Sequence, residues 1–185
     1  MNRNSIKGLL YQDDFLSIEE EKLILSEIDN AVWDASLKRR VQHYGYIYDY
    51  KKKNINQELE IGQLPDWLLS LENKIKIHFN LKNSFDQVII NEYEPGQGIS
   101  NHIDCVPCFE ETIISISLLS PCIMQFSKDQ QKNEILLQSR SILLLSDEAR
   151  YSWKHGIKAV KNDKWQNTVI PRERRISITF RKIMK

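Results

Sequence analysis

The sequence has no long apolar run and no excess of charge of either sign. No stretch approaches the roughly 20 apolar residues that a helix needs to cross a bilayer, and the first residues lack the apolar core of a secretory signal. We therefore expect an intracellular protein, cytoplasmic, or nuclear in a eukaryote, that does not bind membranes. The formal net charge of +1 excludes a general attraction to nucleic acid, so such binding would need local basic patches. Patches of this kind occur at residues 38 to 40, 51 to 53, 158 to 164 and 172 to 175.

Cysteine is scarce as well, with three residues in the chain. Cys105 and Cys108 have the C-x2-C spacing of a zinc ligand pair, but Cys122 cannot provide the second pair that a structural zinc site requires. We therefore expect no structural zinc and three free thiols, as in a reducing compartment.

Two helices followed by a series of short strands are predicted. Ser17-Ile-Glu-Glu20 is a capping box that opens a helix to about Asn30, and Pro65 begins a second helix to about Phe79. The segments that favour strands are 86 to 94, 112 to 119, 121 to 127, 134 to 138, 140 to 146 and 174 to 182. Many short strands separated by turn signals indicate a mainly β fold with flanking helices, a jelly roll or a barrel.

The motif His102-Ile103-Asp104 follows the first of the later strands and the turn signal Pro95-Gly96-Gln97-Gly98. On an extended segment, residues two apart point to the same side, so His102 and Asp104 can bind one ligand. A third ligand would arrive from a distant strand that folds back beside the first, and His155 suits this role. Two histidines and one carboxylate are the facial triad of non-haem Fe(II) oxygenases.

Polar and apolar residues alternate between residues 175 and 182. The polar positions are Arg175, Ser177, Thr179 and Arg181. A strand at the protein surface would explain this alternation, and so would a strand whose polar face lines a binding site. In the second case an arginine could hold the carboxylate of an oxo-acid through two parallel hydrogen bonds, which a lysine cannot reproduce.

These motifs together resemble a known family. Asn91-Glu-Tyr93-Glu-Pro-Gly, His102-Ile-Asp104, His155 and the run from Arg175 to Arg181 resemble, in order and spacing, the AlkB family of Fe(II)/2-oxoglutarate dioxygenases, over about residues 38 to 182. The resemblance implies a double-stranded β-helix (jelly roll) and a reaction that uses Fe(II), 2-oxoglutarate and O2. It implies that the catalytic iron ligands are His102, Asp104 and His155. It also implies that the cosubstrate is bound by Asn91, Tyr93, Arg175, Ser177, Thr179 and Arg181.

The chain departs from the family pattern at two positions. Ser177 stands where the family motif R-x-N-x-T-x-R has asparagine, and its hydroxyl can still form a hydrogen bond. Val106 stands two positions after the metal-binding aspartate, where DNA-repair members of the family carry an acidic residue that contacts the target base. This second departure argues against direct repair of methylated adenine or cytosine.

The segment from Arg39 to Tyr50 resembles the nucleotide-recognition region of the tRNA wobble-uridine hydroxylase branch of the family. Cations in this segment could neutralise phosphates, and tyrosines could stack on an unpaired base. The candidates for phosphate contacts are Lys38, Arg39 and Arg40, and those for stacking are Tyr44, Tyr46 and Tyr48. The alternative is a β-hairpin whose tyrosines pack on the core.

Three classes of function remain open. The first is oxidation of a nucleobase or its alkyl substituent, by hydroxylation or oxidative demethylation, in RNA or tRNA rather than in DNA repair. The second is protein hydroxylation or lysine demethylation, because fold and cofactor do not fix the substrate. The third, a binding module without activity, is opposed by the intact triad and both arginines, and the basic aromatic segment favours the first.

We expect one monomeric domain over residues 1 to 185. The chain has 41% hydrophobic residues and no long linker or internal repeat, so it can bury a single core. A helical and nucleotide-recognition part would extend to about residue 84, and a catalytic core would cover about residues 85 to 183. In the wobble-uridine branch the oxygenase is joined to an RNA-recognition domain and a methyltransferase, so we expect a partner protein to supply RNA binding.

Overall fold

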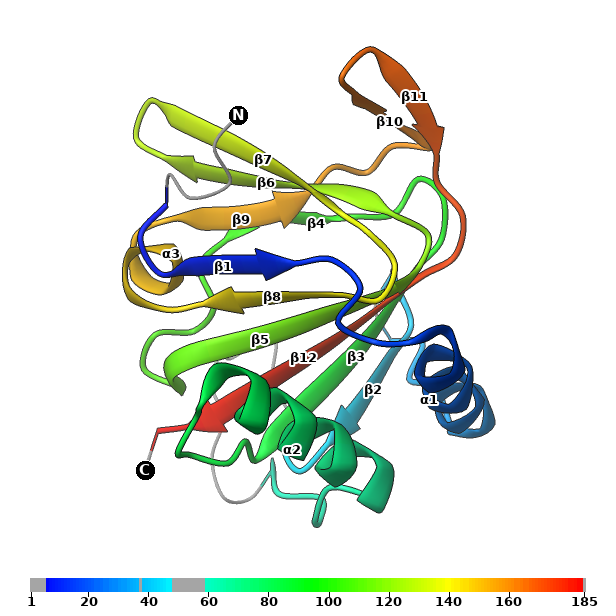
Figure 1. Ribbon diagram of the computed structural model, residues 1–185, viewed down its shortest axis with the longest axis vertical. Helices are drawn as coiled ribbons and strands as arrows, with labels where there is room; N and C mark the ends of the chain where they lie inside the picture. Colours follow the sequence, from blue (N-terminus) through cyan, green and yellow to red (C-terminus); the bar gives the residue numbers. More distant parts are fainter. Residues whose placement is uncertain (1–5, 37, 48–58, 185) are drawn as a thin grey trace.

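The fold consists of two antiparallel sheets and two longer helices that pack on the larger sheet. The computed structural model describes residues 6–36, 38–47 and 59–184 (Figure 1). The six-stranded sheet has the strand order β1-β8-β5-β12-β3-β2, and the four-stranded sheet has the order β4-β9-β6-β7. Two stacked antiparallel sheets are the architecture of a jelly roll, so the predicted fold class is confirmed.

The strands and helices have the following bounds. The larger sheet contains β1 (Leu9–Gln12), β2 (Val41–Tyr44), β3 (Gln87–Tyr93), β5 (Phe109–Leu119), β8 (Ser141–Leu145) and β12 (Arg175–Ile183). The smaller sheet contains β4 (Ile99–His102), β6 (Cys122–Lys128), β7 (Gln131–Leu137) and β9 (Lys154–Ile157). A separate hairpin is formed by β10 (Asn162–Trp165) and β11 (Thr168–Pro171), and the helices are α1 (Ile18–Asn30), α2 (Asp66–Phe79) and α3 (Asp147–Tyr151).

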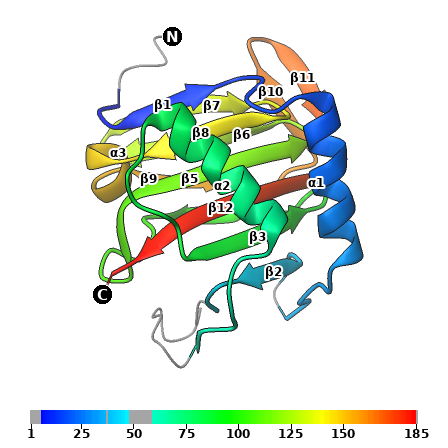
Figure 2. The same ribbon diagram turned by 60° about the horizontal axis from the view of Figure 1, so that its bottom comes forward.

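The helices α1 and α2 cover one face of the larger sheet (Figure 2). Ile28 of α1 and Leu68 and Ile75 of α2 are fully buried in a core that they share with the sheet. The helix α1 begins at the predicted capping box, because the Ser17 hydroxyl accepts from the Glu20 amide at 3.1 Å and the Glu20 carboxylate accepts from the Ser17 amide at 2.7 Å. These two bonds satisfy amide groups that the first turn leaves without partners.

β12 is an inner strand of the larger sheet, paired with β3 on one side and β5 on the other. Its apolar side chains Ile176, Ile178 and Phe180 belong to the core beneath the helices. Successive side chains alternate between the faces of a strand, so the polar ones point toward the smaller sheet. Arg175 is 3% exposed and Thr179 is 9% exposed. The polar face of β12 therefore lines the interior, and the interpretation as a surface strand is wrong.

Most predicted elements are present, and the shortest elements were missed. Both helices and all of the predicted strand segments have counterparts within a few residues. Pro65 occupies the N-cap position, one residue before the helix. The missed elements include β1, β4, β9, β10 and β11, which have four residues each, too few for a periodic pattern to stand out. Of the helices within the described ranges, none combines the length and apolar character that crossing a membrane requires.

The cysteines differ from the prediction of three free thiols. Cys105 and Cys108 form a disulfide, with their Cα atoms 5.2 Å apart, and Cys122 is free and buried. The reason is local, because a turn between the two residues, in which the Cys108 amide donates to the Cys105 carbonyl at 3.2 Å, brings their side chains together. The prediction is therefore wrong for this pair.

The capping box predicts a measurable contribution to stability. Replacing Ser17 by Ala removes the side-chain acceptor, and we expect the free energy of unfolding in urea to fall by about 1 kcal/mol. Ser26→Ala is a matched control, because Ser26 is exposed in the interior of the same helix, and it should change stability by less than about 0.5 kcal/mol. Equal losses in the two variants would contradict a role for the cap.

Candidate active site

Two histidines and one aspartate meet where β4 and β9 pair. The antiparallel register sets His102 opposite His155, with a bulge in β4 between Ile99 and His102. Asp104 follows just beyond the end of β4, and one ligand atom from each of the three residues lies within 4.8 Å of the others. The structure thus brings the three predicted metal ligands together, and their donor set suits a single non-haem iron.

The imidazole of His102 is oriented by its own strand. Its Nδ1 lies 2.8 Å from the Ser100 carbonyl oxygen, and because a carbonyl can only accept, Nδ1 carries the proton. Nε2 is then left with a lone pair for a metal, in the arrangement that commonly fixes the tautomer of metal-binding histidines. Burial and the nearby charge of His155 lower the pKa of His102, which favours the neutral form that binds metals.

Asp104 is a buried carboxylate that lies beside Arg181 and His155. Arg181 donates from Nη2 to Asp104 Oδ1 at 2.6 Å, and His155 Nε2 lies 3.4 Å from Asp104 Oδ2. Burial alone would raise the pKa of Asp104, but the charge of Arg181 and the hydrogen bond from His155 hold this pKa well below its usual value. The carboxylate is therefore ionised, as a metal ligand must be.

Arg175 is a buried cation with unused donors. Its Nη2 donates to the Ser117 hydroxyl at 2.7 Å, and its guanidinium lies over the Tyr93 ring at 5.4 Å. Its Nε and Nη1 are buried and have no hydrogen-bond partner in the described part of the chain. Arg175, Tyr93 and Ile157 line a narrow cavity between β3, β12 and the end of β9. Buried donors of a charged group are rarely left unmatched, so the Nε and Nη1 of Arg175 suit a ligand with carboxylate oxygens.

The remaining predicted cosubstrate residues lie on the same buried face of β3 and β12. The register of these strands sets Arg175 opposite Tyr93. It also sets Ser177 opposite Asn91, whose Oδ1 accepts from Arg39 Nε at 2.8 Å. The structure therefore gathers on one face the predicted group Asn91, Tyr93, Arg175, Ser177, Thr179 and Arg181.

Comparisons with known proteins agree with this geometry. The sequence matches the 2OG-Fe(II) oxygenase superfamily over residues 10–181. It is 38% identical over 204 residues to the "Alkylated DNA repair protein ALKBH8 homolog" of Arabidopsis thaliana, covering 97% of this chain and 59% of that protein. It is 37% identical over 201 residues to the "tRNA (carboxymethyluridine(34)-5-O)-methyltransferase ALKBH8" of Macaca fascicularis, covering 95% of this chain and 30% of that protein. The chain belongs to the AlkB family of 2OG-Fe(II) oxygenases.

The fold of this AlkB-family chain agrees with a solved structure. It superposes on OsALKBH1 with a TM-score of 0.71 at 14% identity, covering 95% of this chain and 96% of the other. The match to the 2OG-Fe(II) oxygenase superfamily, together with the cluster of His102, Asp104 and His155, shows a dioxygenase that depends on Fe(II), 2-oxoglutarate and O2. The chain spans only part of the length of the Arabidopsis and Macaca relatives. The ionised carboxylate between two imidazoles fits Fe(II), and the unmatched donors of Arg175 fit a carboxylate of 2-oxoglutarate.

Two residues predicted to bind the substrate of this AlkB-family enzyme lie on the helix-facing side of the larger sheet, away from the triad. Arg40 donates to Glu92 at 2.8 Å and lies over the Trp33 ring at 4.9 Å. Tyr44 packs edge-on against Trp67 with ring centroids 6.0 Å apart. Tyr44 therefore packs against the helix-facing core, as the alternative interpretation of packed tyrosines proposed. Arg40 is exposed on the same side of the sheet, where it pairs with Glu92.

The other predicted substrate residues have different surroundings. Arg39 lies on the site side, where its guanidinium contacts Asn91 and lies 5.8 Å from the centre of the Tyr93 ring. The Tyr46 hydroxyl donates to the Glu60 carboxylate at 3.1 Å, and its role in stacking stays a prediction. Tyr48 and the basic patch at 51 to 53 lie outside the described residues.

Sequence reasoning missed Arg150, a buried arginine of α3. Its side chain is 2% exposed and donates to the Asp104 carbonyl at 2.9 Å and to the Cys105 and Phe109 carbonyls at 3.2 Å each. These bonds hold the loop that carries Asp104 after the end of β4. No sequence signal separated Arg150 from an arginine on a solvated helix face, because its partners are backbone carbonyls.

The contacts of Arg150 predict a link between this residue and metal affinity. Replacing Arg150 by Leu leaves several carbonyls unmatched, so we expect the dissociation constant for Co(II), measured by calorimetry, to rise about 10- to 100-fold, as for other residues that orient metal ligands. Arg140→Leu is the matched control, because Arg140 pairs with Asp14 and Glu21 beside α1, and its Co(II) affinity should match the parent. A folded Arg150→Leu protein with parental Co(II) affinity would contradict the link.

Proposed function

We propose that this AlkB-family dioxygenase oxidises a nucleobase or its alkyl substituent, and that its substrate is unpaired RNA, most specifically a tRNA anticodon loop. The observation that carries the oxygenase chemistry is the polar face buried between the sheets, with the triad beside Arg181 and the unmatched donors of Arg175 on the same face. Unpaired buried donors destabilise a fold, so their presence in the interior indicates a ligand that pairs with them.

His102, Asp104 and His155 would hold the iron. Fe(II), when bound, supplies the redox chemistry that consumes O2 and 2-oxoglutarate. Ser100 fixes the tautomer of His102 through its carbonyl, and Arg181 keeps Asp104 ionised. The chain would thus supply three ligand atoms to the metal and leave further coordination positions to the cosubstrate and O2.

Arg175 would bind one carboxylate of 2-oxoglutarate through its free Nε and Nη1. Tyr93 lies against the guanidinium, and Asn91 lies two residues before Tyr93 in β3, opposite Ser177. Arg181 uses Nη2 for Asp104 and retains a buried Nε without a partner in the described residues, so we assign it to the second carboxylate. Ser177 and Thr179 complete the polar surface between the two arginines.

The choice of RNA rests on Val106 and on the relatives. Val106, two residues after Asp104, is 45% exposed, and its side chain offers no acceptor for the exocyclic amine of adenine or cytosine. The Macaca relative is named as a carboxymethyluridine methyltransferase of tRNA, whereas the Arabidopsis relative is named for repair of alkylated DNA. Oxidative DNA dealkylation is thus the second candidate. We also propose that the protein acts as a monomer and that a partner protein contributes RNA binding.

Two predictions belong to the proposed function, and the first concerns the cosubstrate. Arg175→Lys replaces a planar group with several donors by a point charge, so we expect the 2-oxoglutarate concentration for half-maximal decarboxylation to rise about 10- to 150-fold, equivalent to about 1.5 to 3 kcal/mol. Arg174→Lys is the matched control, because the neighbouring Arg174 points to the helix side and pairs with Asp29 and Glu92. Unchanged saturation in Arg175→Lys would remove it from the cosubstrate site.

The second prediction concerns the substrate. Incubation of the Fe(II)-loaded protein with tRNA, methylated single-stranded DNA and a methyl-lysine peptide, followed by mass spectrometry, should give an oxidised nucleoside in the tRNA arm. Asp104→Ala is the blank, because loss of a metal ligand should abolish product in every arm. Demethylation of 1-methyladenine or 3-methylcytosine in DNA, with no product on tRNA, would shift the assignment to repair. Product on the peptide alone would shift it to protein modification.

A further inference from the structure

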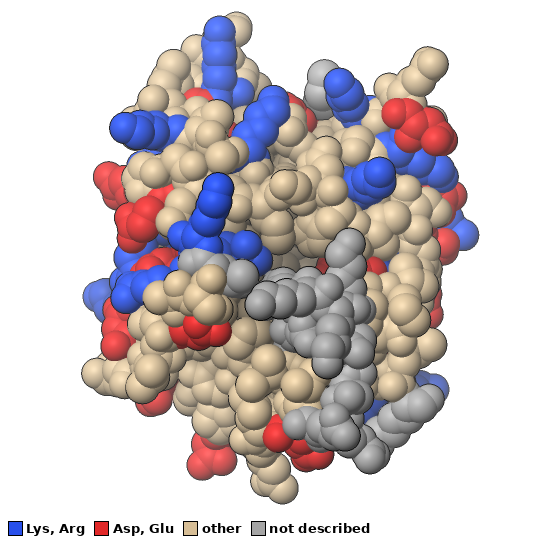
Figure 3. Space-filling model, turned by 180° about the vertical axis from the view of Figure 1, so that it is seen from behind, with Lys and Arg blue, Asp and Glu red and all other residues tan. Residues whose placement is uncertain are grey.

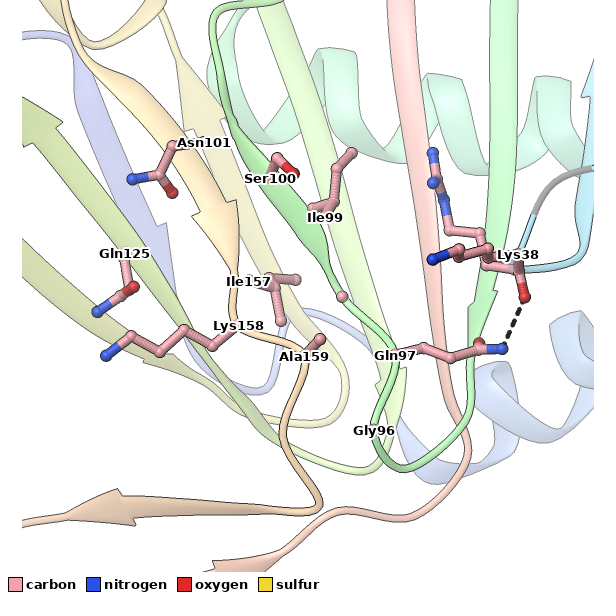
Figure 4. Close-up of a pocket in the computed structure, with 12 residues that line it drawn as sticks. Lys38, Gly96, Gln97, Ile99, Ser100, Asn101, Gln125, Ile157, Lys158 and Ala159 are labelled. Atoms are coloured by element: carbon pink, nitrogen blue, oxygen red, sulfur yellow. Dashed lines mark hydrogen bonds between the residues drawn. The ribbon is translucent and has the colours of Figure 1, made fainter.

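Asp104 is the one residue of the triad that lies outside a strand. His102 is the last residue of β4 and His155 lies in β9, so the pairing of these two strands fixes both imidazoles. Asn101 lies with Lys158 on the outer face of the smaller sheet (Figure 4), and its neighbour His102 therefore points inward. Asp104 reaches the same site only through the loop that leaves β4 at this point.

A disulfide closes this loop directly after Asp104. Cys105 and Cys108 are joined across a turn in which the Cys108 amide donates to the Cys105 carbonyl at 3.2 Å. Val106 and Pro107 lie between the two cysteines, and both are exposed. A covalent link over so short a segment restricts the conformations of its backbone. The link therefore limits the freedom of the residue that precedes it, which is the metal ligand.

Two arginines connect the disulfide loop to the Asp104 carboxylate. Arg150 donates to the Asp104 carbonyl at 2.9 Å and to the Cys105 carbonyl at 3.2 Å, so a shift of one carbonyl disturbs the bond to the other. Arg181 donates to the Asp104 carboxylate at 2.6 Å, and its guanidinium lies 5.0 Å from the centre of the Phe109 ring, directly after the turn. The position of this carboxylate is therefore coupled to the conformation of the turn.

The cysteine pair is open to small reagents on one side. Cys105 is half-buried and is followed by two exposed residues, whereas Cys108 is 5% exposed. Redox-sensing cysteines commonly consist of one accessible sulfur beside a second cysteine that completes the disulfide. The remaining cysteine, Cys122, is 1% exposed in the core and belongs to no disulfide. A change in redox conditions therefore acts on the pair first.

We propose that Cys105 and Cys108 are a redox-sensitive pair whose state sets the metal affinity of the site through the loop that carries Asp104. A dithiol breaks the S–S bond and gives two electrons and two protons to the cysteines, and it leaves as a cyclic disulfide. A hydroperoxide takes the two electrons back, so that the S–S bond forms again and the peroxide leaves as an alcohol and water. The oxidised state holds Asp104 in place, and the reduced state binds metal more weakly. This role depends on Asp104 as a metal ligand but not on the substrate proposed above.

The test compares the metal affinity of the parent protein in its two redox states. Metal-free protein is treated with dithiothreitol or hydrogen peroxide, separated from the reagent without oxygen, and studied by calorimetry with Co(II) alone. Both reagents are uncharged, because the Lys and Arg side chains that gather over the upper half of the face in Figure 3 would attract an anionic thiol. We expect the Co(II) dissociation constant to rise about 10-fold on reduction, as for other groups that orient metal ligands, and to return on reoxidation.

Two variants separate the pair from the other cysteine. Cys105→Ser with Cys108→Ser lacks the disulfide, so it should bind Co(II) as weakly as the reduced parent after either treatment. Cys122→Ala is the matched control, because it keeps the pair, and its Co(II) affinity should respond to the two reagents as in the parent. Mass spectrometry after thiol alkylation verifies each redox state, and circular dichroism verifies that each protein is folded.

The outcomes separate this proposal from the proposed function, because they concern metal binding without any substrate. Equal Co(II) affinity of the oxidised and reduced parent would overturn the proposal, and so would a disulfide that dithiothreitol does not reduce in the folded protein. A redox response that persists in the double serine variant would reject the pair as its source. Parental Co(II) affinity in Asp104→Ala would reject the ligand assignment and the proposal together.

Discussion

The bulge in β4 is the local feature on which the metal site depends. Ile99 and His102 are three residues apart, so on a regular strand their side chains would point to opposite faces. In the pairing with β9, however, Ile99 faces Ile157 and His102 faces His155, and the two partners on β9 are only two residues apart. The extra residue in β4 returns His102 to the inner face, where His155 already points. Without it, the two imidazoles would lie on different sides of the smaller sheet.

The interior of the jelly roll holds several buried charges, and each has a different kind of compensation. Asp104 is matched by Arg181, and Arg150 is matched by backbone carbonyls of the Asp104 loop. Among the described residues, Arg175 is matched only in part, by Ser117 and by the ring of Tyr93. Burial of an unmatched charge opposes folding, so the incomplete compensation of Arg175 is a cost to the unliganded fold. An anionic ligand removes this cost when it binds.

The sequence was sufficient for the features that depend on residue type and period. The long strands and the capped helix follow from alternation and from the capping box. The triad was predicted from His102, Asp104 and His155 together with the family resemblance of the motifs around them. The sequence could not tell which face of the larger sheet Arg40 and Tyr44 would occupy. Their face depends on the register of β2 against β3. The role of Arg150 could not be predicted either, because it donates to backbone carbonyls and every residue type has such a carbonyl. The Cys105 to Cys108 disulfide depends on a turn that the spacing alone did not reveal.

The hairpin of β10 and β11 is attached to the body of the protein by a buried ion pair at its base. Asp163 accepts two hydrogen bonds from Arg172 and one from the Ile123 amide. The turn at its far end consists of Gln166 and Asn167, both with positive φ, and Val169 beside it is 61% exposed. The ion pair of Asp163 and Arg172 at the base involves no residue of the turn, so the turn does not hold the hairpin in place. The tip can therefore change in length and composition without displacing His102, Asp104 and His155.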